Sequence, residues 1–112
     1  GNPLATAAAC AVMELLEGGL IEQVQRAGAR LSERLSGLAK NRRVAGERGQ
    51  GLLRALLLAE DVAPKVVVKA RERGLLVNAI GDRVIRLAPP LTVSDGEIDQ
   101  AAELLQEAVA QA

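Results

Sequence analysis

Glycine and proline residues divide this sequence into short segments, and that division limits its possible folds more than any other feature. The breaks fall at Gly18-Gly19, Gly49, Gly51, Gly74 and Pro89-Pro90. Paired glycines readily end a helix, and proline cannot join an interior strand ladder. Each segment between two breaks is therefore interpreted as one helix or one short strand.

A first helix is expected to begin at Asn2 and Pro3. Asparagine caps free amide groups, and proline at the first helical position loses no hydrogen bond. The alanine-rich run that follows either lets another backbone surface come close or simply reflects the high helix propensity of alanine. Cys10 falls on the expected apolar face of this helix as a buried small hydrophobe. Gly18-Gly19 would end this helix.

A second helix is expected to follow directly. Its charged residues, including Arg30 and Glu33 at helical spacing, would keep the outer face solvated. The apolar residues that recur at helical spacing are Leu20, Val24, Ala27, Leu31, Leu35 and Leu38.

After residue 40 the pattern changes to short apolar runs punctuated by glycine. Residues 43–48 and 51–58 predict two strands, with Gly49 and Gly51 at a bulge or at a close approach of another backbone. These glycines lack the spacing of the dinucleotide-binding and Walker motifs, so a structural bend is favoured over phosphate binding.

The last forty residues continue with helices and strands in alternation. Asp61 is expected to cap a helix, and Ser94 with Glu97 matches a capping box at the start of the last one. The segments predicted are a helix over 61–73, short strands at 75–77 and 84–87, and a final helix after residue 94. This order predicts an α+β fold: a small, mostly antiparallel sheet of three to four strands with helices on one face, preceded by two helices.

Composition removes several function classes. The chain has 112 residues with 14 basic and 14 acidic side chains, so it lacks the excess of basic residues typical of nucleic-acid binders. It has no Phe, Tyr, Trp or His, so it has no aromatic ring to stack on a base or a cofactor. No histidine is available as a general base or metal ligand. The one cysteine indicates a reducing, cytoplasmic compartment. Charge or glycine interrupts every apolar run of about 18 residues, so no membrane span is expected.

Other chemistry-bearing residues point to structural roles. The adjacent acids Glu60 and Asp61 could hold a metal, but they fit a helix N-terminus better. Cys10 has no histidine to activate it as a nucleophile. Arg42-Arg43 is too short for a nucleic-acid patch.

Several motifs resemble, in the same order, those of the C-terminal small domain of class III pyridoxal-phosphate aminotransferases, most closely the acetylornithine and ornithine enzymes. They are Gly1-Asn2-Pro3-Leu4-Ala5, Arg48-Gly49-Gln50-Gly51-Leu52, Gly74-Leu75-Leu76-Val77-Asn78, Val84-Ile85-Arg86-Leu87-Ala88-Pro89-Pro90-Leu91 and the capped helix from Ser94 to Ile98. The resemblance implies transfer of an amino group from N-acetylornithine, or a related omega-amine, to 2-oxoglutarate in arginine biosynthesis. It also implies pyridoxal 5'-phosphate as the cofactor and a homodimeric parent.

The resemblance further implies how the chain is organised. Residues 1–39 would join a missing large domain to the small domain, which would span residues 40–112. The Schiff-base lysine would lie outside this chain, so Lys40, Lys65 and Lys69 match no catalytic motif, no cofactor is expected on the chain alone, and the chain should not transaminate. It therefore contains no expected catalytic, cofactor-binding or metal-binding residue.

One site residue follows from the resemblance. Arg86 matches the family arginine that pairs with a substrate carboxylate, and a guanidinium suits that task because it offers a bidentate fork. From the residues alone, the favoured interpretation is that Arg86 forms an ion pair or extends from a strand edge, and only the resemblance reverses that preference. Two other readings remain open: a stand-alone α/β regulatory or dimerisation module that binds a small amino acid, and a structural partner domain with no ligand.

Overall fold

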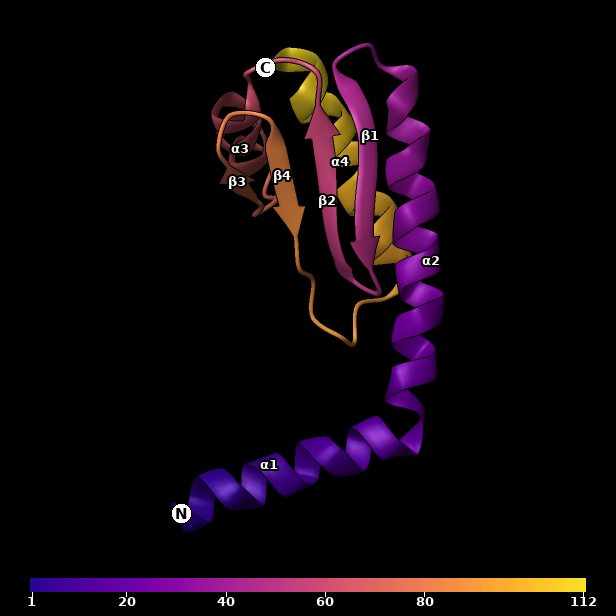
Figure 1. The fold of residues 1–112 in the computed structure, drawn as a ribbon, viewed down its shortest axis with the longest axis vertical. Coiled ribbons are helices and arrows are strands. Elements are labelled where there is room, and N and C mark those ends of the chain that lie inside the picture. Colours follow the sequence, from indigo (N-terminus) through magenta and orange to yellow (C-terminus); the bar gives the residue numbers. More distant parts are fainter.

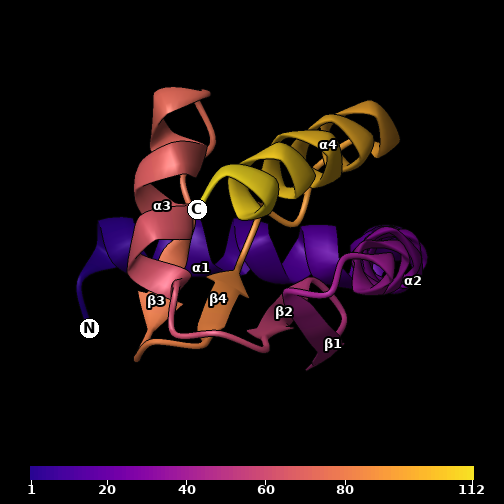
Figure 2. The same ribbon diagram turned by 90° about the horizontal axis from the view of Figure 1, so that it is seen from above.

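The strands form a single sheet, and the packed helices lie on one side of it (Figures 1 and 2). In the computed structural model, which describes residues 1–112, the strands are β1 (Val44–Gln50), β2 (Leu53–Leu58), β3 (Asn78–Ile80) and β4 (Val84–Leu87). They are antiparallel and lie in the order β1-β2-β4-β3. The predicted α+β fold, with a small antiparallel sheet and helices on one face, is confirmed.

Four helices surround this sheet or extend from it. They are α1 (Pro3–Leu15), α2 (Ile21–Gly37), α3 (Ala63–Glu72) and α4 (Asp95–Gln111), with short helical turns at Leu16–Leu20 and Leu38–Lys40. Helix α2 runs along β1, while α3 and α4 pack against each other above the sheet (Figure 2). The capping box at α4 is confirmed, because the Ser94 hydroxyl accepts from the Glu97 amide at 3.1 Å and the Glu97 carboxylate accepts from the Ser94 amide at 3.0 Å.

The core is aliphatic throughout, and no polar side chain is buried in it. Fully buried alanines such as Ala63, Ala70 and Ala108 let the helices approach closely where a chain with aromatic residues would keep them apart. Because α2 contributes to this core, it packs as part of the sheet domain, and the division at residue 39 stays a prediction about a longer protein. The largest fully buried side chains are Leu31, Leu35, Leu56, Val66, Ile85, Ile98, Leu105 and Val109.

Helix α1 lies outside this core. Its N-terminus is capped as predicted, since the Asn2 side chain accepts hydrogen bonds from the Leu4 and Ala5 amides at 2.9 and 3.2 Å. At Gly19 the backbone takes φ 111°, and the chain turns there so that α1 projects away from the domain (Figure 1). None of its residues is buried, so the expectation that Cys10 is buried is wrong.

The helix of 38 residues from Pro3 to Lys40, counted across the turn, is long and apolar enough to cross a membrane by length and composition alone. An 18-residue window in it has a mean hydropathy of 1.6 and is entirely unburied. The sequence prediction missed this because it required an apolar run without charge or glycine, whereas the mean hydropathy of the window stays high despite Glu14 and Glu17. The straight part, α1, rises only about 20 Å over its 13 residues, less than the hydrocarbon core of about 30 Å.

Two predicted segments are displaced. The strand expected at Leu75–Val77 is wrong, because β3 begins only at Asn78. The turn after β3 sets a register in which Ile80 pairs with Val84 and Asn78 with Arg86. Continued to the start of the expected strand, this register would place Leu75 opposite Pro89, which has no amide to donate.

The start of α3 also differs from the prediction. Val62, not Asp61, is the residue before the helix, and it provides no side-chain cap. The Asp61 carboxylate instead accepts a hydrogen bond from Arg83, the last residue of the turn between β3 and β4. The cap failed because an ion pair with a charged partner 22 residues away competes for the carboxylate.

The predicted close approach of backbones at the glycines of the first hairpin is confirmed. A Cβ on Gly28 of α2 would lie 2.5 Å from the carbonyl carbon of Gly51, which sits in the turn with φ 55°. The irregularity in the β1–β2 register falls elsewhere, between Val44 and Gly46. The glycines therefore let α2 pack directly on the hairpin turn.

Candidate functional site

Arg86 lies in the middle of β4, on the face of the sheet that no helix covers. Its neighbours Ile85 and Leu87 are buried on the helical side, and side chains alternate along a strand, so Arg86 points to the open face. It pairs in register with Ala55 of β2 and Asn78 of β3. Anchoring by two buried neighbours fixes the backbone that presents this guanidinium.

The Arg86 side chain has no partner within the chain. It takes part in none of the ion pairs or side-chain hydrogen bonds, and it is exposed to solvent. Six other arginines are engaged with acids, carbonyls or amides: Arg30, Arg34, Arg43, Arg54, Arg73 and Arg83. The charge of Arg86 is therefore available to an external anion.

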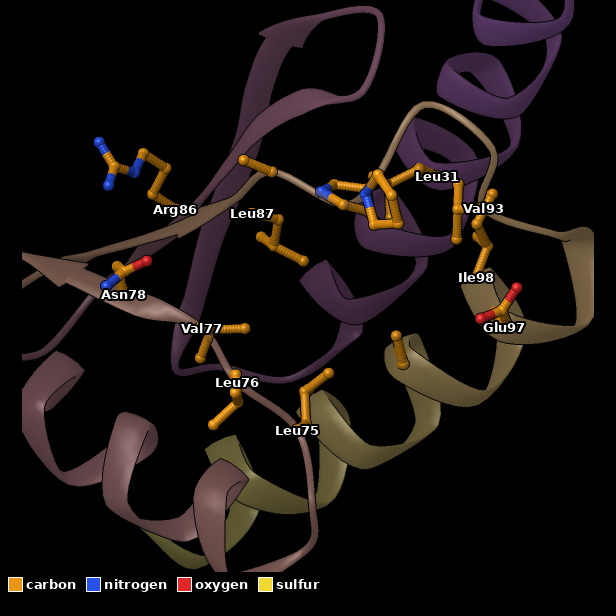
Figure 3. Close-up of a pocket in the computed structure, with 14 residues that line it drawn as sticks. Leu31, Leu75, Leu76, Val77, Asn78, Arg86, Leu87, Val93, Glu97 and Ile98 are labelled. Carbon is orange, nitrogen blue, oxygen red and sulfur yellow. The ribbon is translucent and has the colours of Figure 1, made fainter.

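An apolar cavity of about 310 Å³ lies beside β4. Figure 3 shows its walls, with Leu75 and Val77 below, and Val93 and Ile98 opposite. The Arg86 guanidinium lies at the rim and points away from these apolar walls (Figure 3). Pro89-Pro90 forms the segment after β4, and the Val93 amide closes it by donating to the Pro90 carbonyl at 3.0 Å. This arrangement combines an apolar wall with one free cation at its edge.

The hairpin of β1 and β2 is fixed by a half-buried group of side chains that sequence reasoning missed. The Arg54 Nη1 lies 3.3 Å from the Glu47 Oε2, and the Glu47 Oε1 accepts from the Ser32 hydroxyl at 2.7 Å. Arg54 also donates to the carbonyls of Gly51 at 3.0 Å and Gly49 at 3.1 Å. An arginine inside an apolar run was the only signal for this role.

The acidic dipeptide forms no metal site. Asp61 pairs with Arg83, whose guanidinium holds the pKa of that carboxyl below its ordinary value. Glu60 lies 3.6 Å from the Arg43 Nε. No group of three His, Cys, Asp or Glu side chains is placed to hold a metal ion. Both acids are thus used in ion pairs at the end of β2.

The three lysines lie away from the cavity beside Arg86. Lys40 ends the turn after α2 and Lys65 is in α3, and both are exposed. Lys69 donates to the Glu72 carboxylate at 3.0 Å. None of the three lines the apolar cavity beside β4.

A family model and several known proteins match almost the whole of this chain. The family model of aminotransferase class III covers residues 1–109. Acetylornithine aminotransferase of Ralstonia nicotianae is 46% identical over 110 residues, which are 95% of this chain and 28% of the relative. The enzyme of the same name from Caldanaerobacter subterraneus is 39% identical over 99% of this chain and 29% of its own length.

Solved structures show the same arrangement. Acetylornithine aminotransferase of Elizabethkingia anophelis superposes with a TM-score of 0.87 at 26% identity, over 98% of this chain and 29% of that one. Ornithine aminotransferase of Plasmodium yoelii superposes with a TM-score of 0.77 at 30% identity, over 87% of this chain and 26% of that one. This chain spans less than a third of the length of these relatives. It belongs to the class III aminotransferase family.

Proposed function

We propose that this chain is the C-terminal domain of an acetylornithine-type aminotransferase and that Arg86 binds a substrate carboxylate. The parent would transfer an amino group from N-acetylornithine, or a related omega-amine, to 2-oxoglutarate in the arginine biosynthesis of the cytoplasm. The observation that carries the site is Arg86 itself: it is unpaired, exposed and held on a strand by two buried neighbours. The names of the most similar relatives support the donor class.

The chemistry of Arg86 suits a carboxylate. A guanidinium keeps its charge at any physiological pH and presents parallel N–H donors that match two carboxylate oxygens. Asn78 lies beside Arg86 in the sheet and adds a neutral polar group without cancelling the charge.

The residues of this chain do not fit pyridoxal phosphate. The chain has no aromatic side chain to lie against the cofactor ring, and its lysines are exposed or paired with acid at positions away from Arg86. The groups that hold the cofactor would therefore come from the rest of the parent or from a second subunit. The chain alone would bring the substrate anion to a reaction centre that it does not itself contain.

Helix α1 supports a role as a connection to a further domain. Its exposed apolar residues, including Leu4 at 80% and Leu15 at 63% exposure, lie on a helix that the sheet domain leaves uncovered. We propose that the large domain of the parent covers this helix. The alternative of a free-standing amino-acid-binding module has no comparable support, because the relatives at 38–46% identity are acetylornithine aminotransferases.

The test uses the full-length protein that carries this sequence. Replacing Arg86 with glutamine is expected to lower kcat/KM for acetylornithine and 2-oxoglutarate by about 10- to 100-fold, since a charged hydrogen-bonded pair contributes about 1.5–3 kcal/mol. The matched control is Arg71→Gln, an exposed arginine on α3 with no partner. Unchanged kinetics in Arg86→Gln would remove Arg86 from the site, and absence of any amino transfer to 2-oxoglutarate by the unaltered protein would overturn the proposed reaction.

A further inference from the structure

The bend between α1 and α2 arises at a single residue. Within the wide helical turn Leu16–Leu20, only Gly19 departs from helical angles, with φ 111° and ψ −1°, whereas its neighbour Gly18 stays helical. Leu16 before the two glycines and Ile21 after them also have helical angles. The change of direction between the two helices in Figure 1 is therefore produced by the backbone of Gly19.

No side chain holds this bend in place. A Cβ built at Gly18 or at Gly19 would meet nothing within 4 Å. Helix α1 takes part in no ion pair, and its side-chain hydrogen bonds are local ones between Asn2 and the first turn of the helix. None of its residues is buried. The orientation of α1 relative to the sheet domain thus depends on the backbone angles at Gly19.

Glycine gives these angles two values of similar free energy. A residue without a Cβ takes positive φ about as readily as negative φ, whereas other L-residues are disfavoured there. With helical angles at Gly19, α1 and α2 would form one continuous straight helix. The axis of α2 continues past Leu20 away from the sheet domain, so the straight form meets no other element (Figure 1). It also loses no tertiary contact, because α1 makes none in the bent form.

Helix α2, in contrast, moves with the sheet. Leu31 and Leu35 of α2 belong to the same buried core as Ile85 of β4. The close contact between Gly28 and Gly51 fixes α2 against the first hairpin as well. A rotation at Gly19 would therefore carry α2 and the whole sheet domain as one body relative to α1.

We propose that Gly19 is a hinge that allows a bent and a straight form of the α1–α2 helix. The surface that covers α1 would then select one of the two orientations, as a partner that binds one conformation better shifts the population toward it. This inference rests on the proposed function only in naming the large domain of the parent as that surface. It makes Gly19 the residue that sets the angle between the sheet domain and that surface.

The experiment measures a distance between two spin labels on the 112-residue chain by double electron–electron resonance. One label is attached to Cys10, the single cysteine, which is exposed on α1, and the other to Lys65→Cys at an exposed position of α3. Two distances are expected. The longer one belongs to the straight form, because straightening moves α1 away from the side of the domain where α3 lies (Figures 1 and 2). Dilution with unlabelled chain removes distances between copies. A single narrow distance would show a rigid bend and overturn the hinge.

Two alanine variants identify the hinge residue. Gly19→Ala is expected to lower the ratio of the bent to the straight form by about 5- to 30-fold, because an L-residue disfavours positive φ by that factor. Gly18→Ala, the matched control, adds the same methyl group at a residue that is helical in both forms, so it should change the ratio by less than about twofold. An unchanged ratio in Gly19→Ala would exclude Gly19 as the hinge. Equal changes in both variants would show that helix propensity alone sets the angle.

This measurement is independent of amino transfer. It uses no substrate and does not involve Arg86, so a rigid bend would leave the proposed function standing. A parent protein that transfers no amino group would, in turn, leave two distances and their response to Gly19→Ala unchanged.

Discussion

Helices α1 and α2 follow one another in the sequence and end up in opposite environments. Among its 13 residues α1 has one charged side chain, Glu14, yet none of its residues is buried. Helix α2 carries five charged residues among 17 and buries Ala27, Gly28, Leu31 and Leu35. Apolar composition therefore did not decide which helix joined the core. The separation of apolar and charged residues onto two faces of α2 did.

The two helices also differ in what holds them in place. The α1 helix relies on its Asn2 cap and on internal hydrogen bonds, and a helix of this length is marginal in water without packing. Helix α2 is tied to α4 by two arginines on one carboxylate: the Arg30 Nη2 lies 2.6 Å from one Asp99 oxygen, and the Arg34 Nε lies 2.8 Å from the other. This difference indicates that α2 is part of the folded sheet domain, whereas α1 requires a surface outside that domain to pack against.

The largest expected effect compares one leucine from each helix. Leu35 of α2 is fully buried, and Leu35→Ala should lower the free energy of unfolding by about 2–5 kcal/mol through lost burial and a residual cavity. Leu4 of α1 is 80% exposed, and Leu4→Ala should change the free energy of unfolding by less than about 0.5 kcal/mol. Urea denaturation of both variants measures the contrast. Similar losses would mean that α1 packs on the domain in solution.

A second comparison uses one glycine from each region. Gly28→Ala would place a methyl group 2.5 Å from the backbone of Gly51, so the hairpin turn must move, at a cost of about 1–3 kcal/mol. Gly18, near the end of α1, has nothing within 4 Å of that position, and Gly18→Ala should raise helix content by favouring the helix by about 0.5–1 kcal/mol. Urea denaturation measures the loss of stability in Gly28→Ala, and circular dichroism measures the gain of helix content in Gly18→Ala. A stable Gly28→Ala domain would show that the hairpin turn is not fixed against α2.

Local chemistry made much of the fold predictable. The capping box at Ser94 and the cap at Asn2 depend on residues within four positions of each other, and both are confirmed. The strand expected at Leu75–Val77 was wrong because its position depends on the turn before Val84 and on the prolines that follow β4. The first helix was placed correctly, but burial of Cys10 could not be inferred from helical spacing, since spacing does not reveal whether a partner surface exists.

The candidate site was predictable only in part, because local sequence patterns do not reveal contacts between distant elements. Arg86 stood out through the motif around it, and its role as a carboxylate-binding residue stays a prediction. The bond between Arg30 and Asp99 joins residues 69 positions apart, whereas the sequence pattern paired Arg30 with Glu33. Contacts set by the packing of distant elements leave no local pattern.

The smallest expected effect concerns the ion pairs that distinguish α2 from α1. Hydrogen bonds from Arg34 and Arg30 hold the pKa of Asp99 well below its ordinary value. A carboxyl group whose pKa is lowered on folding stabilises the folded state above its unfolded pKa of about 4, and this contribution is lost as the pH falls below that value. Asp99→Asn should therefore reduce stability at pH 7 and flatten the decline of stability below pH 4, so that the stabilities of the variant and of the unaltered chain converge in acid.

Asp82→Asn, in the turn before β4 and without an ion pair, is the matched control. Curves for Asp99→Asn and the unaltered chain that stay parallel from pH 7 to pH 2 would show that packing alone holds α2 on α4, and the contrast between the two helices would then rest on buried apolar surface.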